Sequence, residues 1–576
     1  MATQENTIFI ESGSFAGHGG WVLDTQFIPN MGSAYLLAHG LGKPVPDATT
    51  TVEIPAAGTY TLWAFTKDWV AAWKPDMAPG LFRVRINGAD SEILGNEGDQ
   101  WHWQKGGTFT LAAGTAEIAL CDMTGFEGRC AALLLTTDEN LTPPNDITEL
   151  DTFRRALCSF TEARFGGAYG LVVAGAGFAG ICAALSAARR GVKVALIQDR
   201  MVIGGNNSSE VRVWLGGETK FDPFPKAGDV TAEFECEKKA HYGAENTAEI
   251  YEDERRLAIL QAEENLDLYL GYFLKDAEMD GDAVQSVTIM DVRSGEHVRL
   301  DAALFADCTG DATLGALANA DFEVTTNGHM GMTNIWHVRD TGTAQSFPKC
   351  PWAIDLTNCV FPGRGDCVDV YGRSREGSFG CWFWESGMEH NPISMAEYAR
   401  DTNLRAMYGA WDCVKNTDKD YGTYELGFAA YIGGKRESRR LFGDVILTKS
   451  EVSKGVQFPD AIVPTTWNFD VHYPDRRFYA AFHEGDGFIT KDYHEAFNKP
   501  YFVPYRVMYS RNIRNLFMAG RNVSVSHDAL GTVRVMRTGG VMGEVVGAAA
   551  ALCLAHGTTP RGVYENHLDA LLNQFR

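Results

Sequence analysis

Short runs of alternating hydrophobic and polar residues dominate the first quarter of the chain. Residues 60–65 are rich in strand-forming side chains, and residues 82–86 alternate between apolar and basic positions. The second run ends in an Asn-Gly pair, a strong signal for a hairpin turn. Further short apolar runs follow, separated by glycine turns and without a long amphipathic helix. This pattern predicts an all-β sandwich over residues 1–145.

The pattern changes after residues 142–146, where two prolines mark a linker. From there on, apolar runs of strand length alternate with stretches of helical period. Such alternation is typical of βαβ units on a mostly parallel sheet. We therefore expect an α/β region to follow the β region.

The first strand of that region runs into a glycine motif. Apolar residues 171–174 precede Gly175, Gly177 and Gly180, and a helical stretch and a second strand at 192–197 follow. The first glycine permits a tight turn, the second lets a pyrophosphate approach the backbone, and the third lets the helix pack on the strand. The helix N-terminus adds amide donors and a partial positive charge. The motif predicts dinucleotide binding.

One position departs from the usual motif. The second strand normally ends in an acid that binds the adenosine ribose. Here Gln198 occupies that position and Asp199 follows it, and either side chain can hydrogen-bond a ribose hydroxyl. The motif itself does not distinguish NAD from FAD.

Three later segments resemble the glutathione-reductase-like FAD-binding fold. They contain Gly204-Gly205-Asn206, Thr309-Gly310-Asp311 and Ala519-Gly520-Arg521, in this order after the glycine motif. The arginine-rich segment at 436–440 and the segment at 520–536 are similar to the bacterial family of FAD-dependent oxidoreductases. This resemblance extends over about residues 165–555 and implies bound FAD.

The resemblance also implies the domain organisation. An FAD-binding domain of the α/β class would comprise residues 146–320 and 511–576, with an α+β substrate domain at 321–510 inserted between them. The β region at 1–145 is similar to carbohydrate-binding-like modules attached to some family members. Its six tryptophans favour core or interface positions for most, with Trp69/Trp73 and Trp101/Trp103 as candidates for exposed or interface rings.

Residue by residue, the resemblance implies FAD contacts along the glycine motif, the second strand and the three later segments. The implied positions are Gly175, Gly177, Phe178, Ala179, Gly180, Gln198, Asp199, Arg200, Gly204, Gly205, Asn206, Ser208, Phe273, Leu274, Thr309, Gly310, Asp311, Gly520, Arg521, Gly540, Val541 and Met542. A helix that starts near Gly539 would direct its positive end toward the flavin and stabilise the anionic reduced form. Arg521 stands where many relatives in the wider superfamily carry Asp.

Three residues are candidates for catalysis. His527 lies seven residues after Gly520, in a loop expected to face the flavin, and histidine suits proton transfer at neutral pH. His472 forms an Asp-Val-His triplet with Asp470 and is the alternative base. Arg534 is a candidate cation over the flavin. Each of the two histidines also has an ordinary structural interpretation, as a hydrogen-bonding residue of a loop.

Charge and cysteine content restrict the partners. With 51 basic and 74 acidic residues, the net charge of −23 argues against nucleic acid or an anionic membrane as a partner. No cysteine pair has C-x-x-C or zinc-like spacing, which excludes disulfide-reductase chemistry and predicts no metal site. The N-terminus shows no signal peptide, so we expect a cytoplasmic location.

These observations favour an FAD-dependent oxidoreductase with a small-molecule substrate. We expect hydride transfer from a hydroxyl of a carbohydrate, glycoside or polyol to flavin N5. One alternative is a C–C dehydrogenase or ene-type reductase, which would need a proton donor opposite the flavin and a more apolar pocket. Another is a flavin-binding protein that recognises a glycan without turnover.

Overall fold

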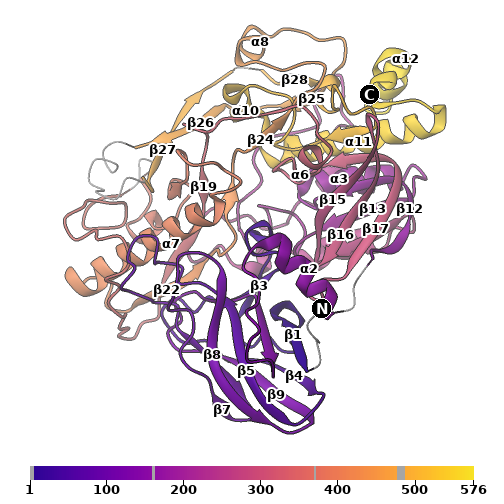
Figure 1. The fold of residues 1–576 in the computed structure, drawn as a ribbon. Coiled ribbons are helices and arrows are strands. Elements are labelled where there is room, and N and C mark those ends of the chain that lie inside the picture. The colour runs from indigo at the N-terminus through magenta and orange to yellow at the C-terminus, as the bar shows by residue number, and fades with distance from the viewer. Residues whose placement is uncertain (1–5, 159–161, 369–371, 476–486, 498) are drawn as a thin grey trace.

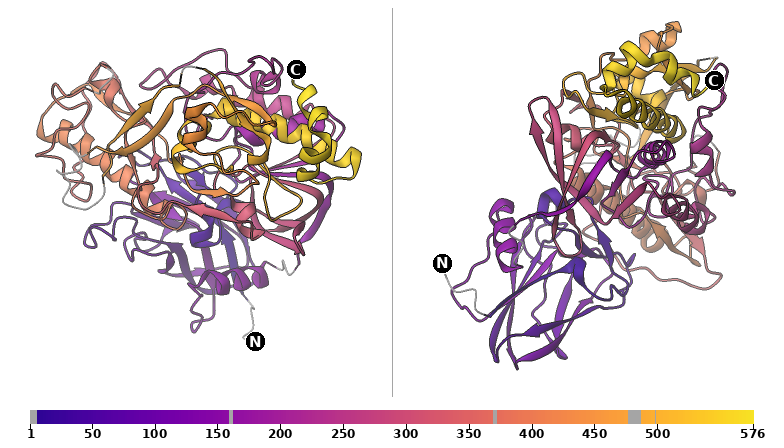
Figure 2. Two further views of the ribbon diagram at one scale, coloured as in Figure 1. Left: turned by 90° about the horizontal axis from the view of Figure 1, so that it is seen from above. Right: turned by 90° about the vertical axis from the view of Figure 1, so that its right-hand side faces the viewer.

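The computed structural model describes the chain except for residues 1–5, 159–161, 369–371, 476–486 and 498. The N-terminal strands form one end of the molecule, and an α/β layer with the C-terminal helices forms the other (Figure 1). The right-hand view of Figure 2 shows the N-terminal strands extending from one end. The segment between residues 322 and 504 lies beside both parts.

The N-terminal strands form three sheets, in the orders β1-β11-β5-β8, β4-β9-β6-β7 and β10-β3-β2. The two four-stranded sheets share a core that includes Leu62, Val84 and Leu120. Alternate residues of β6 are buried, as the period-two pattern predicts. The elements are β1 (Thr7–Glu11), β2 (Val22–Asp24), α1 (Ile28–Met31), β3 (Tyr35–Ala38), β4 (Ala48–Ile54), β5 (Gly58–Thr66), β6 (Phe82–Ile86), β7 (Ala89–Asp90), β8 (His102–Leu111), β9 (Gly114–Asp122), β10 (Gly128–Cys130) and β11 (Ala132–Thr136).

A seven-stranded sheet forms the α/β part, in the order β14-β13-β12-β17-β16-β15, with β29 also paired to β17. Strands β14, β13, β12, β17 and β29 are parallel, and β15 and β16 are antiparallel to their neighbours. The strands are β12 (Arg164–Ala174), β13 (Val194–Gln198), β14 (Leu266–Leu270), β15 (Tyr272–Asp280), β16 (Ala283–Asp291), β17 (His297–Asp307) and β29 (Leu516–Met518). The carboxyl ends of the parallel strands β12, β13 and β17 thus meet at one edge of the sheet, where ligands of such sheets bind.

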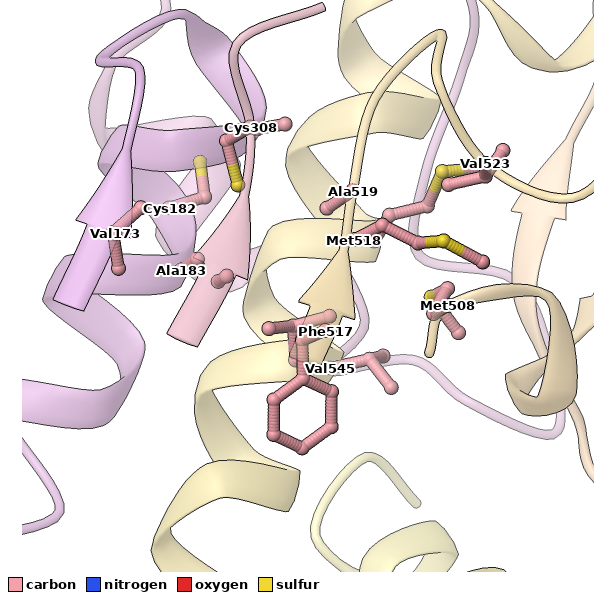
Figure 3. Packing of buried hydrophobic residues seen from close by; sticks show 14 of the residues in the cluster. Val173, Cys182, Ala183, Cys308, Met508, Phe517, Met518, Ala519, Val523 and Val545 are labelled. Atoms are coloured by element: carbon pink, nitrogen blue, oxygen red, sulfur yellow. The ribbon is translucent and has the colours of Figure 1, made fainter. Parts of the chain in front are cut away.

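Two helices from distant parts of the chain cover this sheet in close contact. A Cβ at Gly543 of α11 (Met536–His556) would lie 2.0 Å from the carbonyl oxygen of Ala179 in α3 (Phe178–Ala188). A Cβ at Gly547 would lie 2.5 Å from the carbonyl oxygen of Ala183. Glycine at these two positions therefore lets the helix backbones touch. Figure 3 shows the core beneath them, with Ala183 of α3 beside Val173 and Val545 of α11 beside Phe517 of β29.

The segment between residues 322 and 504, called the inserted segment below, consists of short paired strands and a long buried helix, α7 (Ala396–Asp412). Its strands are β18 (Phe322–Val324), β19 (Met332–Thr333), β20 (Trp336–Asp340), β21 (Glu385–Ser386), β22 (Tyr424–Ala429), β23 (Gly434–Lys435), β24 (Arg439–Leu441), β25 (Ala461–Thr465), β26 (Phe469–Pro474), β27 (Thr490–Glu495) and β28 (Tyr501–Pro504). The remaining helices are α2 (Ile147–Leu157), α4 (Asp229–Glu233), α5 (Asp253–Gln261), α6 (Thr313–Leu317), α8 (Lys449–Lys454), α10 (His527–Val533) and α12 (Pro560–Asn573).

Buried charges attach the N-terminal strands to α7. The guanidinium of Arg400 lies 2.9 Å from Asp24 and 2.8 Å from Asp401, and the side chain is fully buried. Arg129 of β10 reaches the same Asp401 at 2.6 Å and Glu397 at 2.8 Å. A buried charge is costly unless it is paired, and here the charges pair across the two parts of the chain. The N-terminal strands are therefore fixed to the inserted segment.

Helix α2 follows the expected domain boundary at residue 145, but its side chains contact the N-terminal strands. Arg154 of α2 donates to the carbonyl oxygen of Gly32 at 2.7 Å and lies 2.6 Å from Glu11 of β1. Leu150 joins a core with Phe27 and Trp103. By the contacts of Arg154 and Leu150, α2 therefore packs as part of the N-terminal region.

One helix among the described residues, α11, is long and apolar enough to cross a membrane by those two criteria. Of its most apolar window, 78% is buried inside the protein. This burial is what the contact with α3 produces in the centre of a folded core.

Candidate active site

A cavity of about 670 Å³ runs along the sheet edge where β12, β13 and β17 end. Gly177, Asp199 and Thr309 line it from the α/β part, and Trp382, His472 and Arg534 line it from elements further along the chain. Strands β26 and β27 lie well away from β13 in Figure 1, so the cavity connects two separated parts of the fold. Its volume is in the usual range for cofactor and ligand sites.

Glycines line the middle of the cavity. A Cβ at Gly177, the N-cap of α3, would meet only the Cα of Gly205, at 3.9 Å. A Cβ at Gly539 would meet the Cα of Gly520 at 3.6 Å. No side chain caps α3 among the described residues, so its first amide N–H groups face this space. A free helix N-terminus among glycines is a cradle for phosphate groups.

The glycine motif has a different role at each position. A Cβ at Gly180 would lie 1.8 Å from the carbonyl oxygen of Gly175, and one at Gly175 would lie 2.5 Å from that of Cys308. Gly175 also has a φ of +93°, in the left-handed region that favours glycine. Gly180 thus serves close packing and does not line the cavity, which corrects its expected role as a contact.

Gln198 and Asp199, at the end of β13, have different contacts. The amide oxygen of Gln198 accepts a hydrogen bond from the N–H of Ala176 at 2.8 Å, and its amide nitrogen donates to the carbonyl oxygen of Val202 at 3.3 Å. Burial raises the pKa of Asp199, and neighbouring Arg200 opposes that shift. Gln198 therefore shapes the glycine loop, and Asp199 is the acid available to a ribose hydroxyl.

Arg521 lies in a charge network at the ends of β17 and β29. It lies 2.6 Å from Asp311, which lies equally close to Lys435. These two cations hold the pKa of the Asp311 carboxyl well below its usual range although burial opposes them. Arg521 also donates to the hydroxyl of Ser438 at 2.5 Å. Its side chain therefore ties the cavity wall to the inserted segment.

Seventeen of the expected cofactor positions line the cavity, and five do not. Besides Gly180, these are Ser208, Gly540, Val541 and Met542. The Ser208 hydroxyl is buried and donates to the carbonyl oxygen of Gly205 at 2.7 Å, so it shapes the loop. Helix α11 begins at Met536, earlier than expected, and Val535, Met536 and Gly539 line the cavity in place of the later residues, which pack in the core. The other lining positions are Gly175, Gly177, Phe178, Ala179, Gln198, Asp199, Arg200, Gly204, Gly205, Asn206, Phe273, Leu274, Thr309, Gly310, Asp311, Gly520 and Arg521.

His472 of β26 lies in the cavity wall between two carboxylates. Its Nδ1 is 2.6 Å from Glu385 and its Nε2 is 3.1 Å from Asp470. Arg436 and His472 together lower the pKa of Glu385 to about 2 against the effect of burial, so this group is ionised at neutral pH. The side chain of Glu385 is fully buried, so its charge acts on His472 without screening by water.

Asp470 collects four donors. Its oxygens lie 3.0 Å from Arg534 and from the indole N–H of Trp467, and 3.1 Å from His472 and His494. Burial raises the pKa of Asp470, but the charge of Arg534 and the hydrogen bonds to its oxygens outweigh burial and hold that pKa far below the usual range. The bonds to Asp470 and Asp492 raise the pKa of His494 to about 10. Asp470 is therefore a permanent anion that holds cations in the wall.

The same cluster includes the metal-like group Asp470, Asp492 and His494, whose ligand atoms lie within 4.8 Å of one another. Arg534 lies 3.0 Å from Asp470, so a cation already occupies the place beside that carboxylate. The Nε of Arg534 is buried and has no hydrogen-bond partner in the described part of the protein. The contacts form an ion-pair network with one donor left over.

His527 does not line the cavity, contrary to expectation. Ser526 caps α10, and His527 begins the helix with its Nδ1 2.8 Å from Glu437. The bond to Glu437 raises the pKa of His527. The loop after Gly520 turns into a capped helix and does not cross the cavity, so His472 and Arg534 are the two proposed catalytic residues that lie in the wall.

Sequence reasoning missed several wall residues. Trp214, Trp382 and Trp467 line the cavity, although the tryptophans singled out lie in the N-terminal region. His494 and Asp492 were missed as well; in the β26–β27 pair, Asp470 is opposite His494 and His472 opposite Asp492. Residues 470–472 and 492–494 are both Asp-x-His triplets. Two such triplets indicate a pair of strands with the acids and histidines on one face.

The N-terminal tryptophans are not exposed. Trp69 packs edge-on against Trp352 of the inserted segment, and Trp73 donates to the hydroxyl of Tyr398 at 3.0 Å. Trp101 and Trp103 are buried, with the indole of Trp101 3.2 Å from Glu397. The four candidates are therefore core or interface residues and do not form a platform open to solvent.

The fold and the cavity define an α/β protein with a glycine-lined cavity at the sheet edge where such folds bind dinucleotides. The family model of the FAD dependent oxidoreductases matches residues 170–572, and the chain belongs to this family. The protein is therefore an FAD-dependent oxidoreductase with a mixed α/β fold. FAD fits the wall, because the glycine cradle, the uncapped helix α3 and the acid Asp199 suit its phosphates and ribose.

No curated protein sequence matches the chain. Among solved structures, a geranylgeranyl bacteriochlorophyll reductase-like protein from Thermoplasma acidophilum is similar at 12% identity and a TM-score of 0.32, over 71% of this chain and 84% of that one. A myxobacterial chondrochloren halogenase is similar at 14% identity and a TM-score of 0.22 over 32% of this chain, which spans 45% of the halogenase. A family 35 carbohydrate-binding module from Clostridium thermocellum is similar at 18% identity and a TM-score of 0.19, over 22% of this chain and 96% of the module.

Proposed function

We propose that the protein oxidises a hydroxyl group of a carbohydrate, glycoside or polyol, with FAD as the oxidising group. The observation that carries this proposal is the Glu385–His472 pair in the cavity wall, with 2.6 Å between the carboxylate and Nδ1. Alcohol oxidation requires a group that accepts the hydroxyl proton, and a histidine oriented by a carboxylate is suited to that task. Bound FAD supplies the two-electron acceptor.

His472 is the proposed base. In the tautomer that donates Nδ1–H to Glu385, Nε2 carries no proton, gives up its hydrogen bond to the Asp470 carboxylate and takes the proton of the substrate hydroxyl. The imidazolium that forms is stabilised by Glu385 and by Asp470, whose oxygen lies 3.1 Å from Nε2. Asp470 itself is a poor base, because Arg534 and the hydrogen bonds to its oxygens hold its pKa far below the usual range. Arg534 orients Asp470, and its guanidinium adds a positive charge to the wall beside the substrate.

The support for a sugar comes from the cavity and not from the N-terminal region. Trp214, Trp382 and Trp467 bring apolar ring faces into the same wall as His472 and Arg534. Rings beside hydrogen-bonding groups suit a molecule with apolar C–H faces and polar hydroxyls. The glutathione-reductase-like arrangement belongs to the same proposal, supported by Gly175, Gly177, Thr309 and Gly520 around one cavity.

The second candidate is oxidation or reduction of a C–C bond in a substrate that carries a carboxylate. The observation that favours it is the buried Nε of Arg534, since guanidinium groups bind carboxylates in a fork geometry. That reaction calls for a more apolar pocket, whereas Asp470, His472 and His494 line this one. We therefore rank hydroxyl oxidation first.

Anaerobic mixing with a substrate panel tests both candidates. The FAD-loaded protein is mixed with neutral sugars, glycosides, polyols and small carboxylic acids, and the flavin absorbance band is followed. Bleaching by a sugar or polyol supports the first candidate, and bleaching by acids alone supports the second. If no compound bleaches the band although dithionite does, oxidation of these classes is rejected, and reduction of a C–C double bond is tested by return of the band after the dithionite-reduced protein is mixed with unsaturated acids.

A matched pair of histidine variants assigns the base. His472→Ala should slow bleaching about 10²–10⁴-fold, the usual contribution of a general base. His527→Ala removes a histidine that is also paired with a glutamate but lies outside the cavity wall, so it should leave the rate within about twofold. The reverse result would return His527 to the role expected from sequence.

A further inference from the structure

We infer that the N-terminal segment Gln26–Asn30, which lies outside the family-matched residues 170–572, closes the adenosine end of the FAD site. Gln26, Phe27, Pro29 and Asn30 line the same cavity as the glycine motif. The N-terminal region therefore contributes part of the wall of this cavity.

Packing locates the segment at the adenosine end. Ile28 and Ala34 share a small core with Met290 and Val292, and Phe273 packs against that core. The N–H of Val292 donates to Gly271, whose own N–H donates to Arg200, the residue after Asp199. The segment therefore lies beside the end of β13 and the start of β15, where the ribose-binding acid and Phe273 are found.

Hydrogen bonds fix the segment to the opposite wall. The amide oxygen of Gln26 accepts from the N–H of Gly433 at 2.7 Å, and its amide nitrogen donates to the carbonyl oxygen of Tyr431 at 3.1 Å. The loop held in this way continues into Gly434 and Lys435, which also line the cavity. Gln26 thus joins the N-terminal segment to the inserted segment across the cavity.

The chemistry of the segment suits an adenine. Phe27 and Pro29 provide apolar surface together with Phe273 and Ile393, and a flat base gains from such contacts. The amide nitrogen of Asn30 donates to Glu397 at 3.3 Å, which fixes the orientation of its side chain. Arg400 lies 4.9 Å from the ring of Phe27, so the buried charge network supports the segment from behind.

Comparison of FAD with FMN tests this inference, because FMN lacks the adenosine half. Pro29→Trp in the full chain places an indole in the cavity wall from an exposed position and should leave the fold intact. We expect the dissociation constant for FAD, measured by flavin fluorescence on the apoprotein, to rise at least tenfold. The dissociation constant for FMN should stay within twofold of the unmodified protein.

Two further variants complete the test. Asn30→Ala, a smaller change, should weaken FAD about three- to tenfold and leave FMN unchanged. Thr110→Ala, on the exposed face of β8, is the matched control and should change neither constant. Equal weakening of FAD and FMN, or unchanged FAD binding in both cavity variants, would overturn the inference. The measurement needs no substrate, so its outcome is independent of the proposed reaction.

Discussion

The side-chain oxygen of Gln198 accepts a hydrogen bond from the backbone N–H of Ala176 at 2.8 Å. This bond joins the end of β13 to the loop that carries Gly175 and Gly177. An acid usually occupies the position of Gln198 and binds the ribose directly. In this protein the amide holds the loop of the glycine motif, and the nearest acid, Asp199, is one residue further along the chain.

Gln198→Ala should therefore weaken FAD binding through the loop. A buried backbone N–H would lose its partner, and an unsatisfied donor costs roughly 1–3 kcal/mol. We expect about a five- to hundredfold rise in the FAD dissociation constant, measured by titration of the apoprotein. Asp199→Asn should weaken FAD less, because the amide retains hydrogen-bonding capacity. Unchanged affinity in Gln198→Ala would show that the loop holds its shape alone.

Gly177→Val and Gly180→Ala should fail in different ways. Gly177 has a φ of −66°, which any residue adopts, and a Cβ there meets only Gly205, at 3.9 Å. The valine variant should fold, keep its melting transition and remain colourless after addition of FAD, because its side chain fills the cradle.

In contrast, the Cβ of Gly180→Ala would lie 1.8 Å from a backbone oxygen. This variant should lose stability or fail to fold, since neither backbone segment can move without breaking the strand-helix contact. Circular dichroism melts of both apoproteins separate the two outcomes. A yellow Gly177→Val protein would contradict the assignment of the cradle.

Local motifs predicted much of the cofactor wall but little of the substrate wall. Gly175, Gly177 and Gly180 lie close together in the sequence, so their spacing alone predicts the phosphate-binding loop. The His472–Glu385 contact joins residues 87 positions apart, and no local pattern records such a pairing. His527 was misplaced for a similar reason: the sequence shows its distance from Gly520, but the capped helix α10 turns it toward Glu437.

Acid should destabilise the protein partly through Glu385. Its pKa falls from 4.5 to about 2 in the folded state, so it stabilises the fold above pH 4.5 and loses this contribution as the pH falls toward 2. The shift is equivalent to about 3 kcal/mol, at about 1.4 kcal/mol for each pKa unit. Glu385→Gln should be less stable than the unmodified protein at pH 7 and should lose less stability between pH 4.5 and 2. Parallel denaturation curves across that range would contradict this assignment.

Arg400→Met should destabilise the whole protein because it leaves buried carboxylates without a partner. Arg400 pairs with Asp24 and Asp401, and all three side chains are almost fully buried. Removal of one member of such a network costs about 3–5 kcal/mol. Urea denaturation should show this loss.

The double variant Arg400→Met with Asp24→Asn should recover part of that loss, because one unpaired charge is also removed. No recovery would indicate that Asp401 carries most of the penalty. Thr110→Ala again serves as a control that leaves the midpoint unchanged, since its side chain is exposed on β8.

The pairing of β29 with β17, and of α11 with α3, has a consequence for synthesis of the protein. The strand and helix that complete the cofactor domain begin at residues 516 and 536, more than 300 residues after β12 begins. During translation, the edge of β17 and the apolar face of α3 therefore wait without partners while the inserted segment emerges. At a ribosomal rate of about 5–20 residues per second, this interval lasts on the order of tens of seconds. The walls of the cofactor site that β29 and α11 supply are therefore the last parts of that site to be synthesised.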